Sequence, residues 1–250
     1  MRYFFEISYK GTDFHGWQRQ KNAVSIQEIV EDRLSTLLGE EASITASGRT
    51  DKGVHCRKQY FHVDIETQFT RKDLIHKLNS FLPDTIVVHS IERVEDQANA
   101  RFDAVERVYE YFICREKNPF LLDTTLLVHG PLNIQLMNSA AALIIGRHDF
   151  TSFSKVKTDV NTFICTVNMA TWVQKGELIV FRIAANRFLR GMVRALVGTM
   201  IEIGQGKADY EAMNKILQAK DRRAAGPAVA PHGLFLTDVK YPEGLIKRET

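Results

Sequence analysis

The chain has 250 residues, of which 44% are hydrophobic, so it can bury one large core or two modest ones. Its 33 basic and 30 acidic residues give a formal net charge of only +3, so a surface that binds nucleic acid must come from local clustering of charge. Three widely spaced cysteines predict reduced thiols without a bound metal, and the absence of a signal-peptide pattern or a long apolar run predicts a cytoplasmic protein.

The first half of the sequence alternates strand and helix patterns. Residues 2–8 alternate and are rich in aromatic side chains, which indicates a strand. Ser25 and Glu28 have the spacing of a capping box, and the apolar positions that follow keep helical spacing as far as Gly39, a common helix stop. Similar reasoning predicts strands over 42–47, 59–65 and 87–94, and a helix over 70–81 that ends before Pro83.

A comparable order begins again after residue 104. The patterns predict a strand over 108–114, a helix over 135–145, a hairpin of 167–174 with 178–185, helices over 188–203 and 210–219, and a strand over 234–239. The helix over 188–203 is apolar on more than one face and should be largely buried. We therefore expect an α/β (α+β) fold of two similar units, 1–104 and 105–250, with mainly antiparallel or mixed sheets flanked by helices.

The loop from Ala46 to Cys56 carries the strongest local signal for chemistry. Two glycines, Gly48 and Gly53, bracket an arginine, an aspartate and a lysine. The glycines permit positive φ and close approach by a ligand, while the cations would keep the Asp51 carboxylate ionised. An ordinary polar turn, in which this aspartate caps a backbone amide, is the alternative that local composition favours.

The segment from Gly48 to His55 resembles the signature of the tRNA pseudouridine synthase I (TruA-type) family. Further blocks resemble the same family in the same order, at 9–20, 100–104, 107–111, 146–153, 186–198 and 228–236. The resemblance thus extends over nearly the whole chain and implies a pseudouridine synthase fold. Cys56, Asp103 and Pro231 lie where the sequence departs from the commoner pattern, and Cys56 is interpreted as a packing residue.

The resemblance implies that the protein isomerises uridine to pseudouridine in the anticodon stem-loop of tRNA, at positions 38, 39 and 40, as a homodimer. In the family the aspartate at the position of Asp51 is the essential catalytic residue. Every atom of the product is already in the substrate, so no cofactor is expected. The carboxylate can add to the base or the sugar, or remove a sugar proton, and the sequence leaves these routes open.

Two further residues complete the expected catalytic set. The resemblance implies that Arg194, on the apolar helix, pairs with Asp51; a solvent-facing arginine is the alternative. It also implies that Tyr109 lies against the uracil ring, whereas an isolated strand tyrosine would more often be a core residue. Tyr111 is on the same side of the strand and is easily mistaken for Tyr109. A carboxylate, an arginine and a tyrosine together disfavour a non-catalytic RNA-binding protein, while a synthase of the same fold with another RNA target stays open.

Basic and aromatic residues are candidates for RNA contact. The resemblance implies that Arg49 enters the RNA beside the flipped base, with a solvated loop arginine as the alternative. Arg187, Arg190 and Arg194 have helical spacing, so they are expected to form one stripe toward the active site. Weaker candidates, which solvated surface or packing would also explain, are His15, Trp17, Gln18, Arg101, Lys155, Lys157, Lys220, Arg222 and Arg223.

Overall fold

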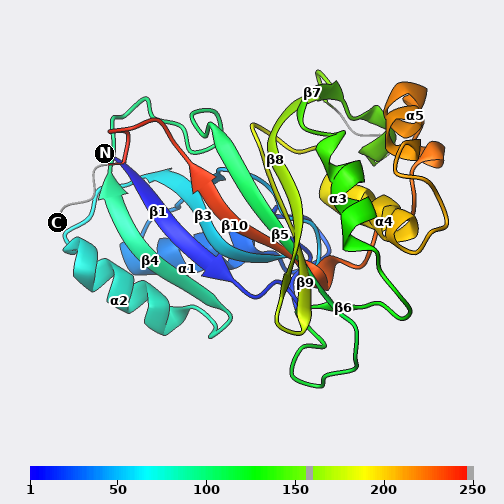
Figure 1. Cartoon of the computed structure of the whole chain (residues 1–250). Coiled ribbons are helices and arrows are strands. Elements are labelled where there is room, and N and C mark those ends of the chain that lie inside the picture. Colours follow the sequence, from blue (N-terminus) through cyan, green and yellow to red (C-terminus); the bar gives the residue numbers. More distant parts are fainter. Residues whose placement is uncertain (156–159, 247–250) are drawn as a thin grey trace. The chain divides into compact units, whose positions relative to one another are not determined.

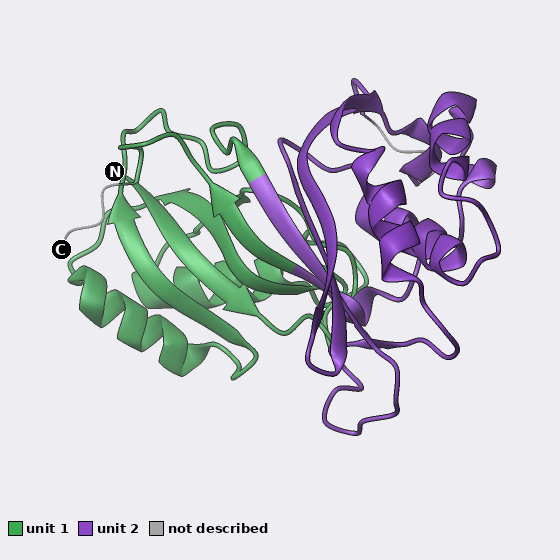
Figure 2. Cartoon of the chain, in the orientation of Figure 1, with its two compact units in different colours: residues 1–106, 236–250 green, residues 107–235 purple. Residues whose placement is uncertain are grey.

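The computed structural model describes residues 1–155 and 160–246. The chain divides into two compact units, which Figure 2 shows in different colours. Unit 1 comprises residues 1–106 and 236–250, and unit 2 comprises residues 107–235. Among the described residues, no helix has both the length and the apolar composition needed to span a membrane.

Unit 1 contains a mainly antiparallel sheet in the order β4-β1-β3-β10, with the short strand β2 also paired to β3. Its strands are β1 (Arg2–Tyr9), β2 (Thr45–Ala46), β3 (His55–Asp64), β4 (Ile86–Arg93) and most of β10 (Leu234–Lys240), and all of these except β2 are labelled in Figure 1. Aromatic side chains in the middle of the sheet form its core. Phe5 and Phe61, for example, are fully buried and stack with ring centroids 4.8 Å apart.

Two helices complete unit 1, and each begins at a residue that the sequence marks. In α1 (Ile26–Leu38) the predicted capping box between Ser25 and Glu28 is present, and Gly39 ends the helix in the left-handed conformation. In α2 (Arg71–Phe81) the side chain of Thr70 caps the first turn. α2 packs along β4 and contacts α1. The predicted strand over 42–47 is shorter than expected, because only Thr45–Ala46 pairs with β3.

In unit 2 the strands pair in the order β5-β9-β8-β7, each antiparallel to its neighbour, and the two-residue strand β6 is parallel to β5. Its strands are β5 (Glu106–Cys114, from Arg107 onward), β6 (Leu126–Leu127), β7 (Gly146–Asp149), β8 (Ile164–Lys175) and β9 (Leu178–Ala185). The predicted hairpin between β8 and β9 is confirmed. Gly176 in its turn has φ 60°, a conformation that favours glycine.

The α-helices of unit 2 are α3 (Ile134–Ala142), α4 (Met192–Gly204) and α5 (Ala212–Ala219), and single 3₁₀ turns are formed by Thr151–Phe153, Arg222–Ala224 and Pro231–Gly233. α3 packs against both β8 and α4. α4 is buried on most of its surface, as its composition predicts. It begins four residues later than the expected start at Phe188, because Gly191 adopts a left-handed conformation with φ 75° immediately before Met192. The mixed α/β class with mainly antiparallel sheets is confirmed.

Candidate active site

Asp51 is half-buried at the first position of a tight turn formed by residues 51–54, which we call the Asp51 turn. The N–H of Val54 donates to the carbonyl of Asp51 over 3.1 Å and closes the turn. Gly53, at its third position, has φ 76°, which a side chain would disfavour. Gly48 does not adopt the positive φ that glycine permits, and an added Cβ there would have no protein neighbour within 4 Å.

A second loop, residues 10–20, holds the Asp51 turn through main-chain hydrogen bonds. The N–H of Gly53 donates to the carbonyl of Phe14 over 3.3 Å, and the N–H of Trp17 donates to the carbonyl of Thr50 over 3.1 Å. These hydrogen bonds hold the main chain on both sides of Asp51. The position of the carboxylate therefore depends on a segment some forty residues earlier in the chain.

Two glycines of the second loop make this close approach possible. A Cβ on Gly11 would lie 2.0 Å from the carbonyl oxygen of Val54, and one on Gly16 would lie 2.5 Å from that of Thr50. The N–H of Gly11 also donates to Nδ1 of the buried His55 over 3.1 Å, so this imidazole carries its proton on Nε2. Sequence analysis missed both glycines, although their place in the block 9–20 was the available signal.

A buried set of side chains lies beneath the loop that precedes Asp51. The Tyr9 hydroxyl contacts Oγ1 of Thr50 at 2.8 Å and donates to Oε1 of Gln59 over 3.0 Å. Nε2 of Gln59 in turn donates to the carbonyl of Gly48 over 3.1 Å. Tyr9, Thr50 and Gln59 are all buried, and none of the three was a predicted site residue.

The exposed rim of the Asp51 turn carries several of the predicted RNA-contacting residues. Arg49 is exposed beside the turn, and Lys52 donates from Nζ to Nε2 of the exposed His15 over 3.1 Å. Gln18 is also exposed. Trp17 is only 1% exposed, so it is a packing residue and not a surface for RNA. The structure thus brings Arg49, His15 and Gln18 to the loops around Asp51.

Arg101 lies at the opposite end of the unit 1 sheet. The residue before it donates its N–H to Nδ1 of His62, which follows His55 by seven residues along β3. At about 3.3 Å per residue this separates Arg101 from the start of β3, and from the Asp51 turn, by roughly 20 Å or more. The Arg101 guanidinium lies over the exposed Phe102 ring, 5.5 Å from its centroid. The structure therefore does not group Arg101 with the residues around Asp51.

In unit 2, Arg194 is half-buried in the first turn of α4 and is fixed by a reciprocal pair of hydrogen bonds. Its Nε donates to the carbonyl of Val229 over 2.6 Å, and the N–H of Val229 donates to the carbonyl of Arg194 over 3.2 Å. Gly198, one turn later, allows the segment to come this close, since a Cβ there would lie 1.8 Å from the carbonyl oxygen of Pro227. The guanidinium plane is therefore set by the main chain.

The two tyrosines of β5 have different environments. Tyr109 is half-buried, and its ring packs edge-on against Phe188 with centroids 5.1 Å apart. Tyr111 is fully buried and donates from its hydroxyl to the carbonyl of Ala230 over 2.7 Å. Burial raises the pKa of Tyr111, so its hydroxyl stays protonated. Tyr109 is thus the one whose ring is accessible to a base.

The predicted helical stripe of arginines is wrong, because α4 begins after Arg187 and Arg190 and only Arg194 lies on it. A different grouping occurs instead. The N–H of Lys155 donates to the carbonyl of Arg190 over 2.9 Å, and both side chains are exposed, while Arg187 is half-buried nearby in sequence. Lys157 lies outside the described residues.

The remaining basic candidates are engaged in local contacts. Nζ of Lys220 lies 3.2 Å from the Asp149 carboxylate. Arg222 donates to two main-chain carbonyls of the segment that follows it. Arg223 pairs with Asp221 at 2.7 Å, and the hydrogen bonds from Arg223 lower the pKa of that carboxyl to about 2. A phosphate would have to compete with these partners.

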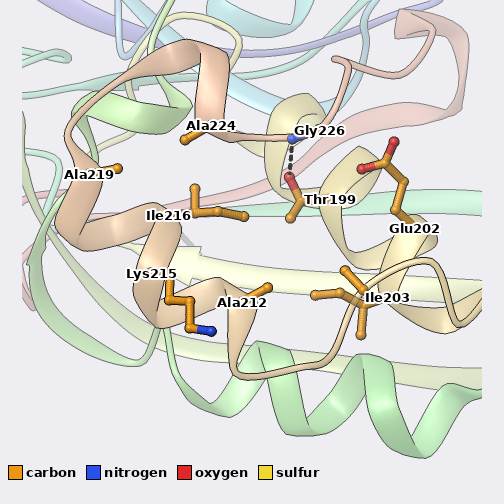
Figure 3. A pocket seen from close by; sticks show the side chains of 10 residues that line it. Thr199, Glu202, Ile203, Ala212, Lys215, Ile216, Ala219, Ala224 and Gly226 are labelled. Atoms are coloured by element: carbon orange, nitrogen blue, oxygen red, sulfur yellow. Dashed lines mark hydrogen bonds between the residues drawn. The ribbon is translucent and has the colours of Figure 1, made fainter.

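A pocket of about 420 Å³ lies in unit 2 between α4, α5 and the segment around Gly226. Figure 3 shows the charged side chains of Glu202 and Lys215 in its lining, and the hydrogen bond of 2.9 Å from the Gly226 N–H to Oγ1 of Thr199. None of the predicted site residues lines it.

The cysteines and acidic residues give no metal-ligand set in the part of the chain that the structure describes, where no group of three or more His, Cys, Asp or Glu is placed to hold an ion. Cys56, Cys114 and Cys165 are all buried as free thiols. Burial raises the pKa of Cys165 to about 11, and it also raises that of Cys56. Cys56, next to the Asp51 turn, therefore stays a protonated packing residue at neutral pH.

Comparison with known proteins identifies the family of the chain. The family described as tRNA pseudouridine synthase matches residues 7–103 and 140–242. Proteins named tRNA pseudouridine synthase A are 42% identical in Parabacteroides distasonis, over 99% of this chain and 99% of the relative, and 43% identical in Bacteroides fragilis, over 98% of each. The protein of that name in Bacteroides thetaiotaomicron is 42% identical over 100% of this chain and 94% of its own length. The chain therefore belongs to the tRNA pseudouridine synthase family.

Proposed function

We propose that this isomerase converts uridine to pseudouridine in the anticodon stem-loop of tRNA, at positions 38, 39 and 40, with Asp51 as the catalytic carboxylate. The reaction breaks the N1–C1′ bond, turns the uracil and forms a C5–C1′ bond, and the proton on C5 is exchanged for one on N1. No atom is gained or lost, so the reaction itself requires only a positioned carboxylate and a means of moving protons. The family and the relatives named above support the activity.

The single observation that carries the assignment of Asp51 is how its backbone is held. The Asp51 turn is closed by its own hydrogen bond, and the loop 10–20 binds it through main-chain hydrogen bonds. Tyr9 and Gln59 hold the loop that precedes it through buried hydrogen bonds. An ordinary polar turn at a surface needs no such support. A carboxylate that must react at one position of a flipped nucleotide needs such support, because a misplacement of about 1 Å can lower turnover by as much as about 100-fold.

In this proposal Arg194 is the counter-charge of Asp51 and Tyr109 is the platform for the uracil. Val229 accepts the Nε–H of Arg194, so pairing with a carboxylate would use the terminal nitrogens of the guanidinium. Phe188 packs with its ring perpendicular to that of Tyr109, which is half-buried. Stacking on such a ring partly compensates the free energy of unstacking the target base.

The proposed RNA contacts follow from exposure and charge. Arg49, beside Asp51, enters the RNA where the target base leaves its stack. Arg190 and Lys155 form a basic pair for phosphates, and Arg187 lies three residues before Arg190 in the sequence. His15 and Gln18 border the Asp51 turn on the second loop. Arg101, at the far end of the unit 1 sheet, would contact a nucleotide well away from the target, and we assign it no part in the chemistry.

The test of this function is Asp51→Asn, assayed by mapping pseudouridine in tRNA that carries uridine at positions 38, 39 and 40. We expect no detectable product, with the Kd for tRNA unchanged within about tenfold, because a carboxylate does not attract phosphates. Asp84→Asn, at an exposed position of unit 1, is the matched control and should keep full turnover.

Each other outcome has a distinct meaning. Appreciable turnover by Asp51→Asn would exclude this carboxylate as the catalytic group. Product in another RNA, but not in the anticodon stem-loop, would show a synthase of this family with a different target. Tight binding of tRNA by the unchanged protein without any product would indicate a non-catalytic RNA-binding protein.

A further inference from the structure

We infer that Tyr9 is a positioning residue for catalysis, which acts through Thr50 and Gln59 to hold the Asp51 carboxylate in place. The inference rests on the proposed role of Asp51. It concerns residues of unit 1 alone, and it assigns a function to a buried network rather than to a group that touches the substrate.

The hydrogen bonds of Tyr9 and Gln59 form a connected network beneath the loop that precedes Asp51. Tyr9 has one hydroxyl proton, which it donates to Oε1 of Gln59 over 3.0 Å. The 2.8 Å contact between the hydroxyls of Tyr9 and Thr50 therefore uses the proton of Thr50. Gln59 then donates from Nε2 to the Gly48 carbonyl over 3.1 Å. The chain of donors runs from Thr50 through Tyr9 and Gln59 to Gly48.

This chain of donors attaches to the loop at two points immediately before the catalytic residue. Thr50 directly precedes Asp51 in the sequence, and Gly48 lies on the other side of the exposed Arg49. Residues 48–50 belong to no helix or strand, so no regular backbone pairing of their own fixes them. Their position therefore depends on Tyr9 and Gln59 from below and on the second loop, through Trp17, from the side.

Burial makes the network stiff. Gln59 is 0% exposed, Tyr9 is 4% exposed and Thr50 is 7% exposed, so water cannot readily replace a lost partner. A buried donor or acceptor that loses its bond either remains unsatisfied or draws the backbone to a new position. In this loop either response displaces the residue next to Asp51, and the expected consequence is a loss of turnover without a loss of RNA affinity.

The aromatic ring of Tyr9 can be separated from its hydroxyl by substitution. The ring packs against Trp17, with centroids 5.9 Å apart, and against the sheet. Tyr9→Phe keeps this ring and removes the oxygen that joins Thr50 to Gln59, which also hydrogen-bonds to the Cys56 thiol. Tyr60 provides the matched control, since it is also 4% exposed and its hydroxyl donates to Glu6 over 2.7 Å, away from the loop.

The experiment compares steady-state turnover of the full chain on tRNA for Tyr9→Phe and Tyr60→Phe. We expect Tyr9→Phe to lower kcat by about tenfold or more with KM unchanged within about threefold, and Tyr60→Phe to change kcat by less than about twofold. Amide hydrogen exchange should increase over residues 47–55 in Tyr9→Phe and not in Tyr60→Phe, which reports the loop independently of activity.

A second pair of variants tests the same network if Tyr9→Phe fails to fold. Thr50→Ser keeps a hydroxyl for the bond to Tyr9, whereas Thr50→Val keeps the shape and removes the hydroxyl. We expect Thr50→Ser to retain kcat within about threefold and Thr50→Val to lose about tenfold or more. Recovery of turnover by the conservative variant is not expected if Thr50 acts only through packing.

The inference is overturned if Tyr9→Phe and Tyr60→Phe lose turnover equally, because the effect is then one of general stability. It is also overturned if Tyr9→Phe, or Thr50→Val, turns over at the normal rate. Failure of the proposed function is distinguished by Asp51→Asn in the same assay. If Asp51→Asn is active, the assignment of the carboxylate is wrong, whatever the result for Tyr9→Phe. If Asp51→Asn is inactive and Tyr9→Phe keeps normal turnover, only the positioning role of Tyr9 is wrong.

Discussion

Arg194 illustrates how a main-chain contact can set the geometry of a single side chain. Its Nε–H is taken by the Val229 carbonyl, and the same two residues share a second hydrogen bond through their backbones. The plane of the guanidinium is thereby fixed, and its terminal nitrogens point in a defined direction. A residue with the same charge but another donor geometry would lose this orientation.

Arg194→Lys tests whether orientation matters in addition to charge. Lysine keeps the positive charge but cannot present a planar fork with one nitrogen held by Val229, so we expect kcat to fall by about 10- to 100-fold. Arg190→Lys, at an exposed position, should stay within about threefold, because a phosphate accepts either cation. Single-turnover rates on tRNA would measure both. Equal effects of the two substitutions would show that Arg194 acts only as a charge.

The sequence predicts Asp51 as the acidic residue of the proposed site but does not predict the residues that hold it. Asp51 stands in a motif that can be recognised from consecutive letters. The residues that hold it are Tyr9, Gln59 and the two glycines of the second loop, which lie outside that motif in the sequence. Their role depends on tertiary contacts that no local pattern encodes. Gly48 is a different case, because its backbone does not use the positive φ that a glycine in this motif permits.

At the scale of elements, the contact between α4 and the segment 225–230 depends on the absence of one side chain. The Pro227 carbonyl lies where a Cβ on Gly198 would be, so the helix and the segment can approach only at a glycine. The same approach allows Val229 to bind Arg194. The packing of this element and the geometry of the proposed site are thus coupled.

Gly198→Ala should therefore destabilise the protein and reduce turnover together. The clash with a backbone carbonyl should cost about 1–3 kcal/mol, against a gain of up to about 1 kcal/mol in helix propensity. Gly204→Ala in the same helix is the control, since a Cβ there meets side chains and no backbone, with Met137 at 2.6 Å and Leu132 at 3.4 Å. Urea unfolding would compare them. If Gly204→Ala were the more destabilising, the close contact at Gly198 would not have the importance assigned to it.

Element types were predictable because their signals are local. The capping box of α1, the Thr70 cap of α2 and the hairpin glycine between β8 and β9 each depend on residues within one or two turns of the chain. The start of α4 was misplaced because apolar spacing continues through the segment before it, while the left-handed Gly191 interrupts the helix. Periodicity gives the face of a helix more reliably than its first residue.

At the scale of the whole molecule, the mixed α/β class follows from alternating patterns and from hairpins, and it agrees with the structure. What no local pattern reveals is that residues 236–250 belong with residues 1–106. In unit 1 the strand β10 lies beside β3, from which it is separated by well over a hundred residues of sequence. Pairing over such a distance is decided by tertiary packing and leaves no periodic signal near either strand.

The family resemblance also predicts a homodimer. A stem-loop placed at one active site leaves the distant body of the tRNA without a surface, which a second copy of the chain would provide. We expect light scattering at assay concentrations to give twice the chain mass, and turnover per chain to fall on dilution below the dissociation constant of the dimer. A fully active monomer would contradict this prediction.

The interruption of unit 1 by unit 2 has a consequence for how the protein is made. During synthesis, residues 1–106 emerge from the ribosome first, yet the strand that completes their sheet is translated only after all of unit 2. At typical elongation rates that delay is on the order of ten seconds. Throughout it, the edge of β3 that later receives β10 is open to other strands. Unit 2, whose residues are contiguous, has no such delay and can become compact before the unit that precedes it is complete.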